Sequence, residues 1–232
     1  PMVFFLFEAE RIVFGGRKNL LPARINTGSQ DPDGIFSKVP QGVAYFLDNE
    51  EALGEQYLRN LGCNGEKFVC LIVRDAEYLR TIDGQKNWDY HSYRDTSIVN
   101  YAKTIEFLVE MGYWVFRMGK VVDSQLSIDH PRVVDYAMST HRSDFLDIWL
   151  MAHCYFAIST GLGLDSIADI FRRPIVFVNY LPVLDLEAWG HFITAPKHLS
   201  WASNHKPLTL HEQLKHTSLN GHYYEEKGIQ VC

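Results

Sequence analysis

The chain has 232 residues, of which 47% are hydrophobic and 22% are charged. This length and composition allow a full hydrophobic core, in one large domain or in one domain with part of another. The net charge of −6 gives no electrostatic footprint for nucleic acid, which proteins bind with lysines and arginines that neutralise phosphates. We therefore expect no nucleic-acid partner, and an anionic ligand has to be held by a few placed arginines and backbone amides.

No hydrophobic run is long enough to cross a membrane. The longest, at 175–184, is interrupted by Asn179 and Pro182, whereas a spanning helix needs about 20 apolar residues. The opening MVFFLF lacks a basic segment and a cleavage site, so we interpret it as a strand and not as a signal peptide. The four cysteines form no CxxC pair, which favours a reducing compartment. The predicted location is the cytoplasm, either free or peripheral at the inner membrane face.

Hydrophobic periodicity predicts alternating helices and strands after an irregular, Gly- and Pro-rich opening at 1–42. The run KFVCLIVR is continuously apolar, as is typical of a parallel strand buried on both faces. In chain order the predicted elements are a helix at 48–61, a strand at 67–74, a loop at 75–96, a helix at 97–111, strands at 113–118 and 132–136, a helix at 143–153, a strand at 154–160, a helix at 164–172, a strand at 175–179 and a helix at 208–216. This alternation predicts an α/β fold, a Rossmann-like doubly wound parallel sheet.

The helix ends carry their own signals. Asp48 and Glu51 predict a capping box for the first helix, and Gly62 ends it. Thr209 and Glu212 predict a second capping box, at the start of the last helix.

The ends of the predicted strands carry groups that could hold a diphosphate. Ligands of doubly wound sheets bind beyond the carboxyl ends of the strands. An arginine there offers a planar fork that matches phosphate oxygens. A small-residue turn into a helix offers backbone N–H groups and the positive end of the helix dipole. The candidate donor-binding residues are Arg74, Arg117, Gly119, Ser159, Thr160, Gly161, Asp165 and Ser166. A salt bridge is the alternative role of each arginine, and an ordinary strand-to-helix turn is the alternative for STGLGLDS.

Two common phosphate motifs do not fit this turn. A dinucleotide fingerprint would place a third glycine at Ser166 and an acid near Asn179, where the next strand ends. A P-loop would need Gly-Lys-Ser/Thr, which is absent from the sequence. We therefore expect neither a nicotinamide nor any other cofactor.

Residues 67–180 resemble a bacterial glycosyltransferase family of surface-polysaccharide type. The resemblance is carried by FVCLIVRDAEYL, YRDTSIVNYAKTIEFLVEMGYWVFRMG, VVDYAMSTHRSDFLDIWLMAHCYFAISTGLGLDSIADIFRRPIVFVN and, more weakly, PLTLHEQL. The layout is more distantly similar to fucosyltransferases with an H-x-R strand end and to heptosyltransferases with an S/D-T-G turn. In those enzymes the arginine and the turn hold the donor diphosphate, which implies these roles for Arg74 and for Ser159, Thr160 and Gly161. Ile72 stands where H-x-R has its histidine, so no histidine role is carried over.

The resemblance implies the C-terminal half of a GT-B glycosyltransferase. Residues 1–65 would be the tail of the N-terminal, acceptor-side domain with a linker, and residues 66–232 the Rossmann-like nucleotide-sugar-binding domain. The start at Pro1 and the end in GIQVC, interpreted as a beginning strand, predict a fragment truncated within that domain. The implied reaction moves a sugar from a nucleoside-diphosphate-sugar donor to a glycan or other hydroxyl acceptor in cell-surface polysaccharide synthesis, without a metal.

The acceptor hydroxyl needs a general base. Asp75, Glu77 and His91 are the candidates, because their loop follows the carboxyl end of a strand. A solvent-exposed loop with no chemical role is the alternative. In the first turn of the helix at 143–153, Asp144 is expected to support the helix through its dipole and not to catalyse.

Other signals point away from a metal site. Asp31-Pro-Asp33 matches the DxD pattern by which some transferases hold a metal, but DPDG is a common turn composition. The ten histidines form no zinc-type cluster. The alternative to an enzyme is a non-catalytic nucleotide- or sugar-binding Rossmann-like module, which Ile72 in place of the histidine favours.

Overall fold

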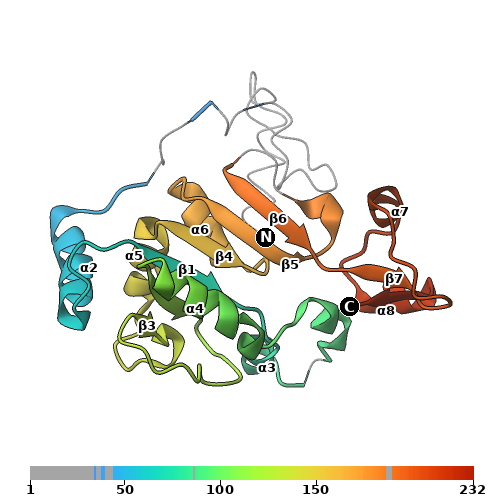
Figure 1. The fold of residues 1–232 in the computed structure, drawn as a ribbon, viewed down its shortest axis with the longest axis horizontal. Helices are drawn as coiled ribbons and strands as arrows, with labels where there is room; N and C mark the ends of the chain where they lie inside the picture. The colour runs from blue at the N-terminus through green and yellow to red at the C-terminus, as the bar shows by residue number, and fades with distance from the viewer. Residues whose placement is uncertain (1–33, 35–37, 40–43, 86, 187–189) are drawn as a thin grey trace, which may run out of the picture.

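The computed structural model describes residue 34 and residues 38–39, 44–85, 87–186 and 190–232 (Figure 1). Its centre is a six-stranded sheet with the order β3-β2-β1-β4-β5-β6, in which every neighbouring pair is parallel. The strands are β1 (Phe68–Ile72), β2 (Trp114–Met118), β3 (Val133–Val134), β4 (Phe156–Ser159), β5 (Ile175–Tyr180) and β6 (Phe192–Pro196). The predicted α/β, Rossmann-like parallel sheet is confirmed.

Helices cover both faces of this sheet. Helices α2 (Asp48–Leu61), α5 (Asp144–His153) and α6 (Asp165–Ile170) pack on one face, and α4 (Ala102–Glu110) with the preceding turn η3 (Ile98–Tyr101) packs on the other (Figure 1). Successive strand residues point to opposite faces. All five residues of β1 are buried as a result, with Phe68, Cys70 and Ile72 in one core cluster and Val69 and Leu71 in the other.

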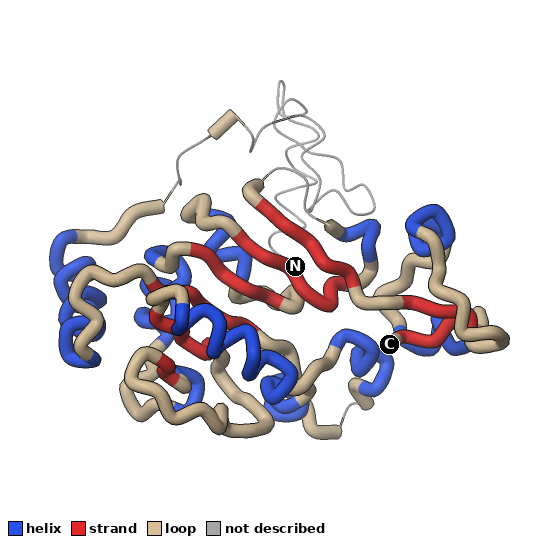
Figure 2. The backbone as a smooth tube through the Cα atoms, viewed as in Figure 1, coloured by secondary structure: helices blue, strands red, loops and turns tan. Residues whose placement is uncertain are grey.

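A smaller unit follows the sheet. It contains a two-stranded antiparallel sheet and a core of its own, to which Tyr93 from the loop after β1 also belongs (Figure 2). Its elements are β7 (Leu199–Trp201), α7 (Leu210–Lys215), α8 (Gly221–Glu226) and β8 (Ile229–Val231). Between the main elements lie α3 (Glu77–Ile82), η2 (Asp89–Arg94), η4 (Tyr136–Met138) and η5 (Val183–Asp185).

Three predicted details differ in the structure. The loop at 75–96 contains two short helices, α3 and η2. The elements β6, β7 and α8 have no counterpart in the prediction; the residues of β6 are mostly exposed or half-buried and show no continuous apolar run. The capping box of α2 lies one residue earlier than predicted. Its N-cap is Leu47 and not Asp48, and Leu47 donates its amide to Glu50 over 2.8 Å.

The predicted end of α2 at Gly62 is confirmed, since Gly62 is its C-cap in the left-handed conformation. Ser97 and Ser143 accept hydrogen bonds from amides in the first turns of η3 and α5. Thr209 and Glu212 form the predicted capping box of α7. The four cysteines are unpaired thiols, and Cys232 is the exposed one. None of the helices that the structure describes has the length and apolar character needed to cross a bilayer.

Helix α2 lies so close to α5 that Gly54 has no room for a side chain. A Cβ atom there would overlap the indole ring of Trp149. The same ring donates Nε1–H to Glu51 over 2.9 Å, so the helices are joined by packing and by a hydrogen bond.

We expect Gly54→Ala to lower the free energy of unfolding by about 1–3 kcal/mol, because the added methyl group overpacks the contact with Trp149. Alanine would otherwise stabilise a helix by about 1 kcal/mol relative to glycine. Urea unfolding measures the change. Gly84→Ala, in an exposed turn with ordinary van der Waals room, is the control, and equal stabilities of the two variants would contradict the predicted overlap.

Candidate functional site

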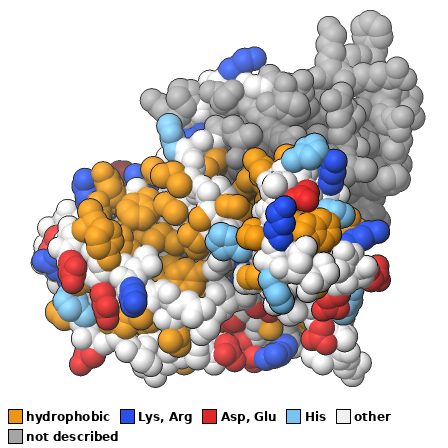
Figure 3. Space-filling model, turned by 45° about the vertical axis from the view of Figure 1, so that its right-hand side comes forward, with side chains coloured by type: hydrophobic (Ala, Val, Ile, Leu, Met, Phe, Trp, Pro, Cys, Tyr) orange, Lys and Arg blue, Asp and Glu red, His pale blue; other side chains and the backbone are white. Residues whose placement is uncertain are grey.

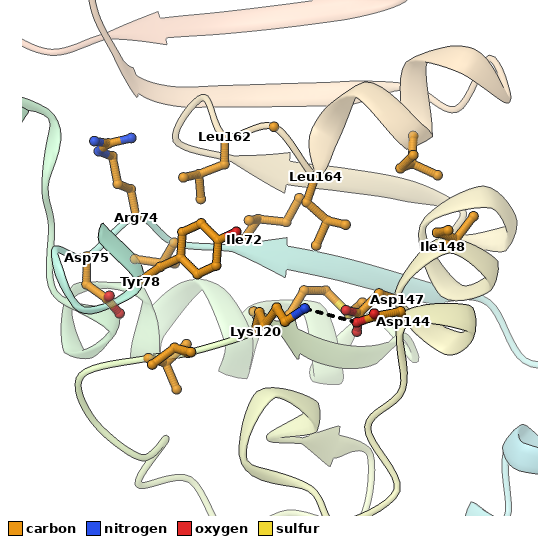
Figure 4. Close-up of a pocket in the computed structure, with 17 residues that line it drawn as sticks. Ile72, Arg74, Asp75, Tyr78, Lys120, Asp144, Asp147, Ile148, Leu162 and Leu164 are labelled. Carbon is orange, nitrogen blue, oxygen red and sulfur yellow. Dashed lines mark hydrogen bonds and ion pairs between the residues drawn. The ribbon is translucent and has the colours of Figure 1, made fainter. Parts of the chain in front are cut away.

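A cavity of about 430 Å³ opens at the carboxyl ends of β1, β2 and β4 (Figure 4). The chain builds β1, β2 and β3 toward one edge of the sheet and then returns to place β4 on the other side of β1. The loops after β1 and β4 therefore diverge to opposite faces and leave a crevice between them. Open α/β sheets bind their ligands in this crevice.

The walls of the cavity are mainly aliphatic. Leu162 and Leu164, from the turn after β4, point into it, and the ring of Tyr78 from α3 lies across it (Figure 4). The further apolar lining residues are Ile72, Val73, Met118, Val121, Val122, Ile148 and Ile167. Such a lining suits a ring or another apolar part of a ligand, with specificity left to a few polar groups.

Three of the polar lining residues, Lys120, Asp144 and Asp147, lie together at one side of the cavity (Figure 4). Lys120 Nζ lies 3.4 Å from Asp144 Oδ1, and Arg142 pairs with both Asp144 and Asp147. Burial raises the pKa of Asp147, and the neighbouring Arg142 acts in the opposite direction. Lys120 and Asp144 are more than half exposed, so their ion pair contributes little to stability. The Lys120 side chain can therefore leave this pair and bind a ligand anion.

Asp75 lies at the end of the cavity nearest α3 (Figure 4). Its Oδ1 accepts the amide of Glu77 at 3.0 Å, and its Oδ2 accepts the amide of Asp123 at 3.1 Å. These two bonds join the loops that follow β1 and β2. The carboxylate is thereby held in one orientation at the cavity wall.

The turn between β4 and α6 is built by its own polar side chains. The buried Ser159 hydroxyl donates to Asp165 Oδ2 over 2.7 Å and accepts the amide of Gly161 at 3.0 Å. Asp165 also accepts the amide of Leu162 at 2.8 Å, and burial raises the pKa of this carboxyl group. These two amides are therefore engaged within the turn.

The amides of the next two residues, Gly163 and Leu164, are not engaged within the turn. Gly163 and Leu164 line the cavity, and their amides donate to no other group in the described part of the chain. A Cβ atom on Gly163 would meet nothing within 4 Å. The turn thus presents open backbone to the cavity at this point.

Gly161 has a structural reason to be glycine. Its φ of +81° belongs to the left-handed region, and a Cβ atom would lie 2.8 Å from Tyr180. Its carbonyl accepts a hydrogen bond from Arg94 Nη2 over 2.7 Å. The conformation of this residue shapes the turn, which carries Leu162, Gly163 and Leu164 to the cavity.

The two arginines predicted to grip a diphosphate are engaged elsewhere. The guanidinium of Arg74 points away from the cavity and pairs with Asp95 over 3.1 Å (Figure 4). Arg117 is 1% exposed within β2 and pairs with Asp135 over 3.1 Å, so it does not line the cavity. The salt bridge, the alternative stated for each arginine, is the arrangement that the structure has.

Only part of the predicted set meets at the cavity. Arg74, Asp75 and Gly119 line it, Arg74 with its guanidinium turned away. Of the other base candidates, Glu77 pairs with Arg80, and the ring of His91 packs at a tilt against the ring of Tyr90, with 4.1 Å between the ring centroids. The predicted residues that do not line the cavity are Glu77, His91, Arg117, Ser159, Thr160, Gly161, Asp165 and Ser166.

Sequence reasoning missed several lining residues. Lys120 directly follows Gly119 at the end of β2, so the strand-end argument extended by one residue would have found it. Asp147 sits in the first turn of α5, which starts at the rim because a crossover helix begins at the side where the preceding strand ends. Tyr78 is an aromatic residue of the loop that follows β1, which was the signal for it, but the helix α3 that positions its ring was predicted as a loop.

The described residues contain no group of three or more His, Cys, Asp or Glu side chains arranged to hold a metal ion. Asp31 and Asp33, the DxD match, lie outside the described residues. No family model matches the chain, and no curated protein or solved structure matches it either.

The buried pair of Arg117 and Asp135 generates a prediction. Asp135→Ala should lower the free energy of unfolding by roughly 3–5 kcal/mol, because it leaves the guanidinium buried without a counter-charge. Asp135 also accepts the amide of Leu126 at 2.8 Å, which adds to the loss. Chemical denaturation tests this against Asp129→Ala, an exposed aspartate of the same loop. Equal stability of both variants would show that the pair does not hold β2.

Proposed function

We propose that the chain is a glycosyltransferase that binds a nucleoside-diphosphate sugar in the cavity at the ends of β1, β2 and β4. The observation that carries the proposal is the position of this cavity, at the reversal of strand order in a parallel sheet. Nucleotide ligands of open α/β sheets bind at this point. The resemblance stated above supplies the reaction class, the transfer of the sugar to a hydroxyl group of a glycan. A role in surface-polysaccharide synthesis and a cytoplasmic location stay predictions.

The apolar lining supports a ligand with a ring system next to a charged group. The aliphatic walls and the Tyr78 ring suit the base or another ring of the donor. The phosphate oxygens would then meet Lys120 and the amides of Gly163 and Leu164, which have no other partner in the described chain. This assignment replaces the guanidinium groups of Arg74 and Arg117, which pair with Asp95 and Asp135.

These groups would also act on the reaction itself. Negative charge builds on the diphosphate as the sugar leaves, and preoriented cations and amides stabilise it. Asp75 is the candidate base that lines the cavity, and its two amide partners hold its carboxylate in place. An acceptor hydroxyl that reaches Asp75 would transfer its proton to the carboxylate as the oxygen attacks the sugar.

Gly163→Val tests the donor site by steric block. Gly163 has no positive φ and free space around its Cβ position, so valine fills cavity volume without backbone strain. We expect it to weaken binding of UDP or GDP at least about tenfold, or about 1.4 kcal/mol, in isothermal titration calorimetry.

Gly84→Val, in an exposed turn outside the cavity, is the control and should bind as the parent does. If both variants retain the parent affinity for the nucleotide that binds, the phosphate lies elsewhere. If neither UDP, GDP nor ADP binds the folded parent chain, the proposal loses its basis.

Asp75→Asn tests the base. The amide oxygen still accepts one of the two backbone amides and the other bond is lost, so binding of the donor should weaken little, whereas turnover should fall by about 10²–10⁴. Release of nucleoside diphosphate from the donor, in the presence of a glycan acceptor, measures turnover. Glu77→Gln should leave it unchanged, since Glu77 faces Arg80 outside the cavity. A loss of turnover in Glu77→Gln, with no loss in Asp75→Asn, would identify Glu77 as the base instead.

One observation favours the alternative, a non-catalytic nucleotide- or sugar-binding module. Both oxygens of Asp75 already accept backbone amides, which is also the arrangement of a purely structural aspartate. Binding of a nucleotide sugar without release of nucleoside diphosphate, for every acceptor tried, would select this alternative.

A further inference from the structure

One face of the sheet lies open over β5 and β6. The helix on this side is α4, which lies in front of the sheet and over β1 (Figure 1). Its core cluster contains two buried residues of β1 and one each of β2 and β4, namely Val69, Leu71, Val115 and Ile158. Among the described residues, no helix packs on β5 or β6 from this side. Because parallel sheets of α/β proteins are covered on both faces, this part of the sheet lacks a layer.

The side chains of this open part are apolar. Val176 and Val178 of β5 belong to the α4 side, where they pack against its cluster and stay half-buried. Ile193 of β6 pairs with Val176 in the sheet, so it points to the same side, and it is 70% exposed. Figure 3, in which this side is turned to the left, shows hydrophobic side chains gathered there. A contiguous apolar surface that stays exposed marks an interaction site.

The outer side of η3 and α4 carries exposed apolar side chains as well. Val99, Phe107 and Met111 are 70%, 59% and 57% exposed. Their spacing of four or eight positions places them on one side of the helix. Lys103 stands between them, and its aliphatic stem can lie on apolar surface while its ammonium group reaches water. The helix therefore offers a mostly apolar outer side in addition to the side that packs on its own sheet.

The width of the open face fits α4 of a second copy of the chain. Counted from β1, β5 is the second strand along, in the order β1-β4-β5. Neighbouring strands lie about 4.8 Å apart, so a helix over β5 would lie about 10 Å from α4. Packed helices have their axes about 8–10 Å apart. A two-fold axis parallel to the strands and above β4 therefore places α4 of each copy on β5 and β6 of the other, with the two helices side by side.

The charges along this contact are complementary. Helix α4 runs opposite to the strands, because it connects the carboxyl end of β1 to the amino end of the parallel β2. Its exposed Glu106 and Glu110 therefore lie toward the amino ends of the strands. Two exposed basic residues stand at these ends, Lys67 over the ring of Tyr155 and His191 before β6. The two-fold axis keeps the strand direction, so the glutamates of each copy meet the basic residues of the other. An anionic lipid surface would repel the same glutamates.

We propose that the chain forms a two-fold dimer in which α4 of each copy covers the open face of the other, at Val176, Val178 and Ile193. Each copy thereby supplies the helix that the other copy's sheet lacks on this side. The contact occurs twice by symmetry, which doubles the area that it buries. The larger cavity is lined from α5 and from the turn before α6, which pack on the other face, so the dimer leaves it open. The inference does not depend on the proposed function.

Analytical ultracentrifugation of the 232-residue chain over a range of concentrations tests the dimer. We expect a monomer–dimer equilibrium that shifts to the dimer as the concentration rises. Phe107→Glu and Ile193→Glu each bury an unpaired carboxylate twice in the contact, so each should raise the dimer Kd at least about tenfold. Leu53→Glu is the control, because Leu53 is 60% exposed on α2, which packs on the opposite face of the sheet, and its Kd should equal that of the parent.

Cysteine pairing tests the arrangement of the two copies. A Cys232→Ser background removes the exposed native thiol. In this background, a mixture of Phe107→Cys chains and Ile193→Cys chains should form a mixed disulfide dimer on mild oxidation. A mixture of Phe107→Cys chains and Leu53→Cys chains should not, because Leu53 lies on the far face. Equal yields from the two mixtures would overturn the proposed contact.

The other occupants of the open face are outcomes of the same series. A chain that stays monomeric at every concentration overturns the proposal, and so does a dimer whose Kd is unchanged in both Phe107→Glu and Ile193→Glu. A monomer that sediments with phosphatidylcholine–phosphatidylglycerol vesicles, but not as Phe107→Glu, would assign the face to a membrane and overturn the dimer. Phe107→Glu should bind UDP or GDP as the parent does. If the parent binds neither, the proposed function fails and the dimer result stands.

Discussion

Burial of a parallel sheet on both faces is the constraint on which the rest of this structure depends. The central strands have to be apolar on both sides, and α-helices form the connections from β1 to β2, from β3 to β4 and from β4 to β5. All carboxyl ends then lie at one edge, together with the loops that leave them. Polar side chains excluded from the sheet gather at this edge, and the reversal of strand order beside β1 opens the larger cavity there.

Several charged side chains at this edge bind other groups of the same edge and hold its loops in place. Asp95 holds Arg74, Asp135 holds Arg117, and Asp165 holds the turn after β4. Each pair satisfies a charge that burial would otherwise make costly. The larger cavity is left mainly apolar, with Lys120 and open backbone amides among its polar groups. A smaller cavity, between η2, α8 and β8, has more polar walls.

Much of the fold could be predicted from the sequence, because the signals involved are local. The run at 67–74 predicted β1, Gly62 predicted the end of α2, and Thr209 with Glu212 predicted the cap of α7. Each depends on residues within a few positions of one another, so periodicity and capping rules suffice. The edge strand β6 was missed because an exposed edge imposes no continuous apolar run on its residues.

For the candidate site, the sequence by itself determined which residues stand at strand ends, including Asp75 and Gly119. Only the tertiary structure decided which of them face the cavity. Arg117 and Asp135 are 18 positions apart and Arg74 and Asp95 are 21, and no local rule predicts that they pair. A side chain's direction depends on the partner that lowers its free energy most, and such partners come together only when the chain folds.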